Sequence, residues 1–180
     1  MIRGDMVKED TDYHDFLPKN FVTIPKEIKG TQGYLLSHDG LFRMFTASGI
    51  DRGGFYNDRL NKHFRVSGNS LITIDSTASY STIGTIDGYS QCSMPYSFQS
   101  QLIVSGGNVY RYASGVLTKL TDTDFGYPLD CDWIDGYYFF TDGESLYHTL
   151  LADETQVAPT DYAVAEIMPD KSLGVMRTPD

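Results

Sequence analysis

The sequence predicts an all-β fold, a partial β-propeller of four-stranded blades, with about three blades in this chain and an extended N-terminal arm. Short apolar runs alternate with turns rich in Gly, Asn and Asp, as between β-strands. Tyr (13), Phe (10) and Gly (17) are abundant, and this composition also favours β structure. The phrases FRVSGNSLITI (64–74), LIVSGGNVYRY (102–112) and FFTDGESLY (139–147) echo one another at a period typical of propellers or solenoids.

The N-terminal arm, residues 1–33, has neither the periodicity of a strand nor that of a helix. Pro18 and Pro25 disfavour both a helix and a central strand. The arm is therefore expected to be extended and pinned by its apolar side chains, which are Tyr13, Phe16, Leu17, Phe21 and Ile24.

The first strand of each blade is expected to carry a small side chain where neighbouring sheets approach closely. The proposed equivalents are Gly54, Cys92 and Cys131, within RGGFYN (52–57), SQCSMPYS (90–97) and PLDCDWI (128–134).

An apolar second strand, a Gly-containing turn and a third strand follow in each blade. Aligning the three phrases makes Val66, Val104 and Phe140 equivalent, at spacings of 38 and 36. The expected second strands are KHFRVS (62–67), SQLIVS (100–105) and GYYFFT (136–141), and the third strands are SLITID (70–75), NVYRYA (108–113) and SLYHTL (145–150). Fourth strands are expected at YSTIGTI (80–86) and GVLTKLT (115–121). An up-and-down barrel or a sandwich is the alternative, but neither requires the long-period echo.

The repeats divide the chain into three parts. Residues 1–33 form the arm, residues 34–151 form three propeller-type repeats, and residues 152–180 begin a further blade that breaks off. Propellers close with about four to eight blades, and exposed sheet edges promote aggregation. The chain is therefore expected to be a fragment of a longer protein; the alternative is that another chain supplies the missing blades.

The net charge of −10 argues against a chain that grips nucleic acid, because such proteins concentrate Lys and Arg. An acidic surface would suit the wall of a channel that DNA passes without binding to it, but it would equally serve only to keep the protein soluble. Cys92 and Cys131 form no C-x-x-C pair and are expected to be buried, reduced thiols. The sequence shows neither a membrane-spanning apolar run nor a signal peptide, so folding in a cytoplasm is expected.

No motif predicts a catalytic, cofactor-binding or metal-binding site, so the chain is not expected to be an enzyme and no cofactor is expected. Asp122, Asp124, Asp130, Asp132 and Asp135 cluster, but the Gly and Glu of a calcium loop are missing. The tripeptide DFG (124–126) stands without the rest of the kinase motifs. His14, His38, His63 and His148 lack metal-ligand spacing.

The N-terminal part resembles the packaged-DNA stabilisation proteins of short-tailed phages, which are tail accessory or head-completion factors. The resemblance covers roughly residues 12–75. It departs from the family at SHDG (37–40), where members tend to have an Arg-Ser-Phe-Pro-Gly-like turn. The matching residues are Asp12, Tyr13, Asp15, Phe16, Leu17, Pro18 and Asn20, then Pro25, Lys26 and Glu27, then Gly33, Tyr34 and Leu35, and finally Arg52, Gly53, Tyr56 and Asn57.

This resemblance implies a structural virion protein. Such proteins assemble as a ring below the portal, retain the packaged DNA and form a platform for later tail proteins. The implied partners are the portal protein or its adaptor, other tail proteins and further copies of the chain, with no sequence-specific nucleic-acid binding and no membrane. The implied location is the virion tail, after assembly in the host cytoplasm.

In this interpretation the five apolar anchors of the arm are interface candidates; alternatively, the arm packs on its own propeller. A carbohydrate-binding or glycoside-cleaving propeller is the alternative function, because propellers also host such activities. SHDGLF (37–42) only faintly resembles a sialidase box.

Overall fold

The computed structural model describes residues 21–24, 34–37, 43, 45–75, 77, 79–164 and 171–178, and it divides into two units, Met1–Thr46 and Ala47–Asp180. In the first unit, β1 (Phe21–Ile24) pairs with β2 (Tyr34–Ser37) in an antiparallel ladder. The sequence predicts that these two segments belong to different parts of the chain, the arm and the first repeat. Both are only four residues long, too short for their periodicity to identify them as strands.

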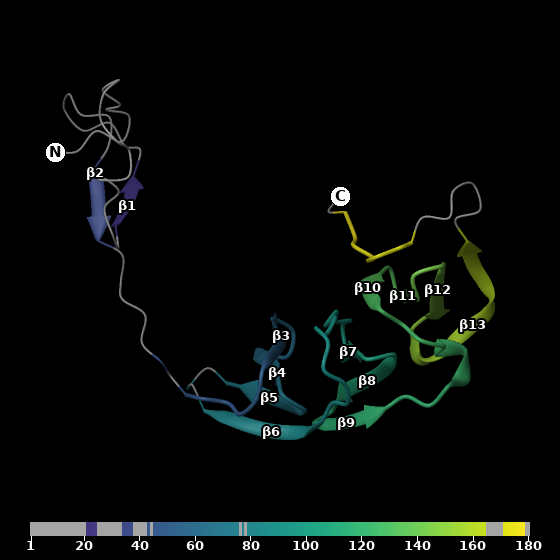
Figure 1. Ribbon diagram of the computed structural model, residues 1–180, viewed down its shortest axis with the longest axis horizontal. Helices are drawn as coiled ribbons and strands as arrows, with labels where there is room; N and C mark the ends of the chain where they lie inside the picture. The colour runs from purple at the N-terminus through teal and green to yellow at the C-terminus, as the bar shows by residue number, and fades with distance from the viewer. Residues whose placement is uncertain are drawn as a thin grey trace. The chain divides into compact units, whose positions relative to one another are not determined.

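The second unit contains three antiparallel sheets that follow one another in chain order (Figure 1). The first sheet consists of β3 (Asp51–Asn57), β4 (Lys62–Ser67), β5 (Ser70–Ile74) and β6 (Tyr80–Thr85). The second consists of β7 (Gln101–Ser105), β8 (Asn108–Ala113) and β9 (Val116–Lys119). The third consists of β10 (Asp130–Ile134), β11 (Tyr137–Thr141), β12 (Ser145–Leu150) and β13 (Asp153–Val164).

The predicted all-β class is confirmed. A single 3-10 turn, η2 (Thr123–Phe125), interrupts the strands, and no α-helix occurs among the described residues. No helix in this described part could cross a membrane.

Two strand predictions differ from the structure. The expected first strand at 90–97 joins the second sheet only through the isolated bridges Ser93↔Val104 and Tyr96↔Gln101. Pro95 lies between these bridges and has no N–H to donate to a continuous ladder. Part of residues 152–180, expected to begin a further blade, instead forms β13, the outer strand of the third sheet.

The predicted alignment of the third repeat is wrong by one residue. Ser67 pairs with Ser70 and Ser105 with Asn108 across the middle hairpins, and Asp142 N–H donates to the carbonyl of Ser145 at the corresponding place. Thr141, rather than Phe140, is therefore equivalent to Val66 and Val104.

The predicted small-residue position of the first strands also changes. By the same registers Met94, rather than Cys92, is equivalent to Gly54 and Cys131. A shift of one residue turns every side chain of a strand to the opposite face of the sheet. Because Phe139 and Phe140 are both aromatic, the sequence pattern does not distinguish the two alignments.

Two hydrophobic clusters fill the spaces between the sheets. The first joins Phe64, Val66 and Leu71 of the first sheet to Ile103, Tyr110 and Tyr112 of the second. The second joins Leu102, Val104 and Val109 of the second sheet to Tyr138, Phe140 and Tyr147 of the third. The first and second sheets thus each bury one face against the sheet that follows, as in successive propeller blades.

Candidate assembly surfaces

Arg52 fastens the junction between the first two sheets. Its side chain is only 4% exposed. Nε donates to the carbonyl of Ser90 at 2.9 Å, and Nη1 donates to the carbonyls of Gly68 at 2.9 Å and Ile86 at 3.1 Å. Nη2 donates to the carbonyl of Asp87 at 3.1 Å and to Ser105 Oγ. One guanidinium therefore ties β3 to the middle hairpin turn of its own sheet, to the connector and to the second sheet.

A second set of polar contacts crosses both junctions at the opposite end of the inner strands. Asn57 Nδ2 donates to Gln101 Oε1 at 3.1 Å, and Gln101 Nε2 donates to the carbonyl of Met94 at 2.8 Å. Tyr138 OH donates to the carbonyl of Ser100 at 3.4 Å, and burial raises the pKa of this phenol to about 12. These bonds satisfy polar groups that would be costly to bury unpaired.

The two thiols are free and buried. Burial raises the pKa of Cys131 well above its ordinary value and raises that of Cys92 as well. Both thiols therefore remain protonated at neutral pH, as structural rather than reactive cysteines do.

An ion pair links the middle strand of the second sheet to the outer strand of the third. Arg111 Nε donates to Glu154 Oε1 at 2.6 Å, and the Glu154 side chain is 12% exposed. Burial is the largest single influence on the pKa of Glu154 and raises it, but the hydrogen bonds that the carboxylate accepts, together with the positive charge of Arg111, outweigh burial and lower the pKa.

We expect acid to weaken the junction between the second and third sheets. The pKa of Glu154 is lower in the folded than in the unfolded chain. Ionised Glu154 therefore contributes fully to the stability of the fold above its unfolded pKa, which is about 4.3. This stabilising contribution is lost as the pH falls through the pKa of Glu154 in the folded chain. The thermal midpoint should therefore drop between about pH 5 and pH 3, more in the parent chain than in Glu154→Gln. Equal pH slopes for the two proteins would contradict this role.

Large apolar side chains are exposed at the entry to each sheet. Ile50 is 81% exposed, Tyr89 is 92% exposed and Tyr127 is 61% exposed. Each follows a glycine with positive φ, at Gly49, Gly88 and Gly126.

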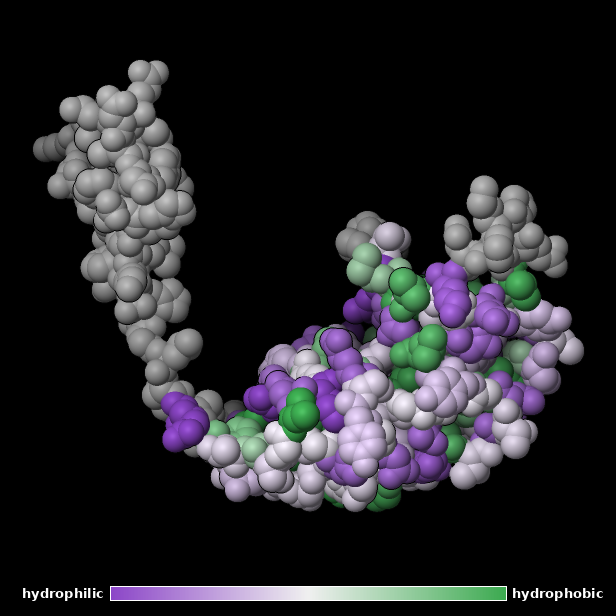
Figure 2. Space-filling model, viewed as in Figure 1, coloured by the Kyte–Doolittle hydropathy of each residue, from purple (hydrophilic) through white to green (hydrophobic). Residues whose placement is uncertain are grey.

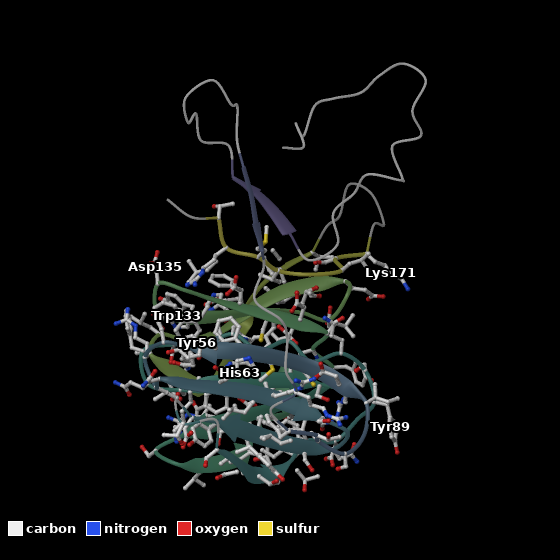
Figure 3. The ribbon with its side chains drawn as sticks, turned by 90° about the vertical axis from the view of Figure 1, so that its left-hand side faces the viewer. Tyr56, His63, Tyr89, Trp133, Asp135 and Lys171 are labelled. Carbon is white, nitrogen blue, oxygen red and sulfur yellow. The ribbon has the colours of Figure 1, made fainter. Side chains whose placement is uncertain are left out.

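These entry residues lie beside the middle hairpin turns of the sheets. Gly49 lies against Gly68, and Gly88 against Gly106. The ring of Tyr127 lies against Gly107 so closely that a Cβ there would overlap it. Figure 3 shows Tyr89 at the opposite end of the sheets from Tyr56, Trp133 and Asp135. These three residues, Ile50, Tyr89 and Tyr127, are called the connector row, because each is an exposed large apolar side chain at the start of a sheet.

Aromatic contacts mark the other end of the sheets. Arg59 lies over the ring of Phe98 at 5.0 Å, and Phe98 meets Trp133 edge-on at 5.0 Å between centroids. One residue from each sheet thus takes part in a row of side-chain contacts that crosses all three sheets, although Phe98 itself is 62% exposed.

The predicted interface residues of the arm fall mostly outside the described residues. Tyr13, Phe16 and Leu17 are not among them. Phe21 and Ile24 lie at the two ends of β1, paired with Ser37 and Tyr34 respectively. The structure therefore leaves their docking role a prediction.

Three of the five clustered aspartates, Asp122, Asp130 and Asp132, accept hydrogen bonds from backbone N–H groups of other residues. Asp122 accepts from the N–H groups of Asp124 and Val157, at 3.1 Å and 3.0 Å. Asp130 and Asp132 accept from the backbone of residues 175 and 177. Within the described ranges no group of His, Cys, Asp or Glu side chains is arranged to hold a metal ion.

Sequence reasoning missed Arg52 and the connector row as features of the assembly. Arg is rarely buried, so its type gives no signal of this role. The connector row had a readable signal, a Gly followed by Ile or Tyr in each repeat, at spacings of 39 and 38.

Comparison with known proteins gives two matches. A family model described as Bacteriophage P22 Gp10, beta-propeller, matches residues 1–180. The chain is also similar to the "Tail hub protein gp10" of Salmonella phage P22, with 31% identity over 182 residues. That alignment covers 93% of this chain and 37% of the phage P22 protein, so the chain spans little more than a third of the relative's length.

Proposed function

The chain belongs to the P22 Gp10 β-propeller family, and from this premise we propose that it is a structural protein of a phage tail. The similarity to a tail hub protein carries the proposal. The stacked sheets and the exposed connector row support it, since they offer a rigid body and a contact surface. On this proposal the protein acts by assembly and not by catalysis, and it resides in the virion tail.

In its finer form, the protein assembles as a ring below the portal after synthesis in the host cytoplasm, retains packaged DNA and supports later tail proteins. Contacts repeated around an axis close a ring without any chemistry. The net charge of −10 would limit adhesion of DNA to the ring.

A reconstitution experiment tests this function. DNA-filled heads that lack tails are mixed with the complete protein, and nuclease-sensitive DNA is measured over time. The proposal expects co-sedimentation with the heads and loss of nuclease sensitivity. No binding to heads or portal rings, together with specific binding on a glycan array, would contradict it in favour of the carbohydrate-binding alternative.

The arm is proposed to dock on a neighbouring subunit or on the portal through Tyr13, Phe16, Leu17, Phe21 and Ile24. Phe16→Ala combined with Phe21→Ala should abolish ring assembly and leave the thermal unfolding of the body unchanged, because the lost apolar contacts lie between subunits. Analytical ultracentrifugation measures assembly. The control is Val116→Ala, which removes a 62% exposed side chain from β9. Intact assembly of the double variant would contradict the docking role.

A further inference from the structure

The chain enters each sheet of the second unit at the same end, which is called the connector end. The connector row lies there, and Ile50, Tyr89 and Tyr127 are 81%, 92% and 61% exposed. Figure 3 shows Tyr89 on the side of the sheets that faces the viewer in Figure 2, where hydrophobic patches interrupt a largely hydrophilic surface. The second unit therefore exposes apolar groups at the connector end.

Close glycine contacts join Tyr89 to Tyr127. Gly88 precedes Tyr89 and lies against Gly106, since a Cβ at either glycine would be 3.4 Å from the Cα of the other. The next residue of the same turn is Gly107, and the ring of Tyr127 lies directly against it. The turn of these two adjacent glycines thus lies between the two tyrosines.

Arg52 joins Ile50 to Tyr89 in a similar way. Gly68 N–H donates to the carbonyl of Ile50 at 2.8 Å. Arg52 donates to the carbonyls of Gly68 and Ser90, each at 2.9 Å, and Ser90 directly follows Tyr89 in the sequence. The three members of the connector row therefore belong to one continuous strip of surface.

The strip continues beyond Tyr127. Leu129 is 46% exposed, and its Cδ1 atom lies against the hairpin turn at Gly143. Ser172 N–H donates to the carbonyl of Gly143 at 3.0 Å, and the next residue, Leu173, is 83% exposed. Single exposed apolar residues are normal on a protein surface, but a contiguous strip of them marks a contact site. This strip is called the connector band and comprises Ile50, Tyr89, Tyr127, Leu129 and Leu173.

Negative charges border the connector band. Asp124 lies in η2, and Asp142 and Glu144 lie in the hairpin turn that Leu129 contacts. None of these three carboxylates belongs to an ion pair formed by the described residues. Lys171, on the same side in Figure 3, offsets only one of these charges. The connector end therefore favours a partner that is both apolar and positively charged.

The ladder of β1 and β2 provides an apolar face. Paired residues of an antiparallel ladder share a face, and successive residues of a strand alternate between faces. By this register four apolar or aromatic residues take positions on one face, called the docking face: Val22, Ile24, Tyr34 and Leu36. A two-stranded ladder alone is marginally stable in water at best, so a surface that covers this face would stabilise it.

The segment that contains this ladder is positively charged. Residues 16–37 contain Lys19, Lys26 and Lys29 against the single acidic residue Glu27, which gives a net charge of +2. The apolar docking face and this charge are both complementary to the connector end. A second copy of the chain supplies such a ladder, and a contact between two different surfaces, repeated from copy to copy, can close a ring.

We propose that the docking face of one copy lies on the connector band of the next copy, with the lysines of the arm beside Asp124, Asp142 and Glu144. This inference rests on the proposed assembly of the chain into a ring, and it names the surface that receives the arm. The docking face includes Ile24, one of the predicted anchors, whereas Phe21 takes the opposite face. Apolar contact covers the ladder, and the opposite charges orient it.

Cross-linking between two differently tagged copies of the complete protein tests this proposal. One copy carries Val22→Cys in the docking face and the other carries Tyr89→Cys in the connector band, and the mixture is treated with a short bismaleimide. Thr23→Cys, on the opposite face of the ladder, is the control for the first copy. Val116→Cys is the control for the second, because Val116 is 62% exposed at the β8–β9 turn, away from the connector end. The parent protein gives the background of the two buried thiols.

The proposal expects the pair Val22→Cys and Tyr89→Cys to cross-link between copies with at least about tenfold higher yield than either control pair, because docking raises the effective concentration of the two thiols. Equal yields with Thr23→Cys or Val116→Cys would overturn it. Cross-linking within a single copy that carries both substitutions, with no product between copies, would also overturn it and identify the copy's own ladder as the occupant.

Analytical ultracentrifugation of the same samples separates this proposal from the proposed ring. Assembly without a cross-link at Tyr89→Cys would overturn the docking site alone and leave the ring in place. Absence of both assembly and cross-link would overturn the two together.

Discussion

Arg52→Ala is expected to lower the free energy of unfolding by about 3 to 5 kcal/mol, because several buried and partly buried oxygen acceptors would lose a charged donor at once. Arg52 is 4% exposed, and its guanidinium donates to the carbonyls of Ser90, Gly68, Ile86 and Asp87. Alanine cannot reach any of them, and the bonds to Ile86 and Ser105 are buried. The junction between the first two sheets should therefore weaken before either sheet does.

Urea denaturation followed by the fluorescence of the single Trp measures this effect. Arg65→Ala is the matched control, because Arg65 is 39% exposed and pairs with Asp51 on the surface. Surface ion pairs contribute about 1 kcal/mol or less, so the control should unfold nearly as the parent does. A loss as small for Arg52→Ala as for Arg65→Ala would show that the guanidinium does not hold the junction.

Phe140→Ala is expected to lower the free energy of unfolding by about 3 to 5 kcal/mol, the range for a large aromatic truncated in a core. Phe140 is 0% exposed and packs against Phe125 and Tyr147, with ring centroids 5.4 Å and 5.7 Å away. Truncation would leave a cavity in the cluster between the second and third sheets.

The neighbouring substitution Phe139→Ala supplies the control in the 180-residue chain, and the same denaturation experiment measures both. Phe139 is only partly buried, so its loss should cost about 1 kcal/mol or less. The contrast between adjacent phenylalanines also tests the register of β11. A larger effect at Phe139 than at Phe140 would mean that the strand faces the other way.

Most strands of the second unit could be predicted from the sequence, because glycine turns and apolar runs mark them locally. The predicted segments 62–67 and 108–113 coincide with β4 and β8. Features that depend on packing between sheets could not be predicted. The alignment of Phe140 is one of them, since choosing between two adjacent phenylalanines requires knowing which face is covered. The long pairing of β13 with β12 is another, because register shifts interrupt it.

The candidate surfaces were less predictable than the strands. The arm anchors stand out in the sequence because they are apolar in a segment without periodicity, but Phe21 and Ile24 lie in the short strand β1. The sequence does not distinguish an anchor on a partner from a residue of a small sheet. Arg52 matched a family motif, but its burial results from carbonyl groups contributed by distant segments.

The central claim is that successive sheets stack through their faces and do not join edge to edge. A nuclear Overhauser spectrum of the 180-residue chain tests it most directly. The account predicts cross-peaks between the rings of Phe64 and Tyr112 and between those of Phe98 and Trp133, whose centroids are each 5.0 Å apart. Backbone cross-peaks joining residues 80–85 to residues 101–105, with no contacts between those rings, would reveal one continuous sheet and contradict the account.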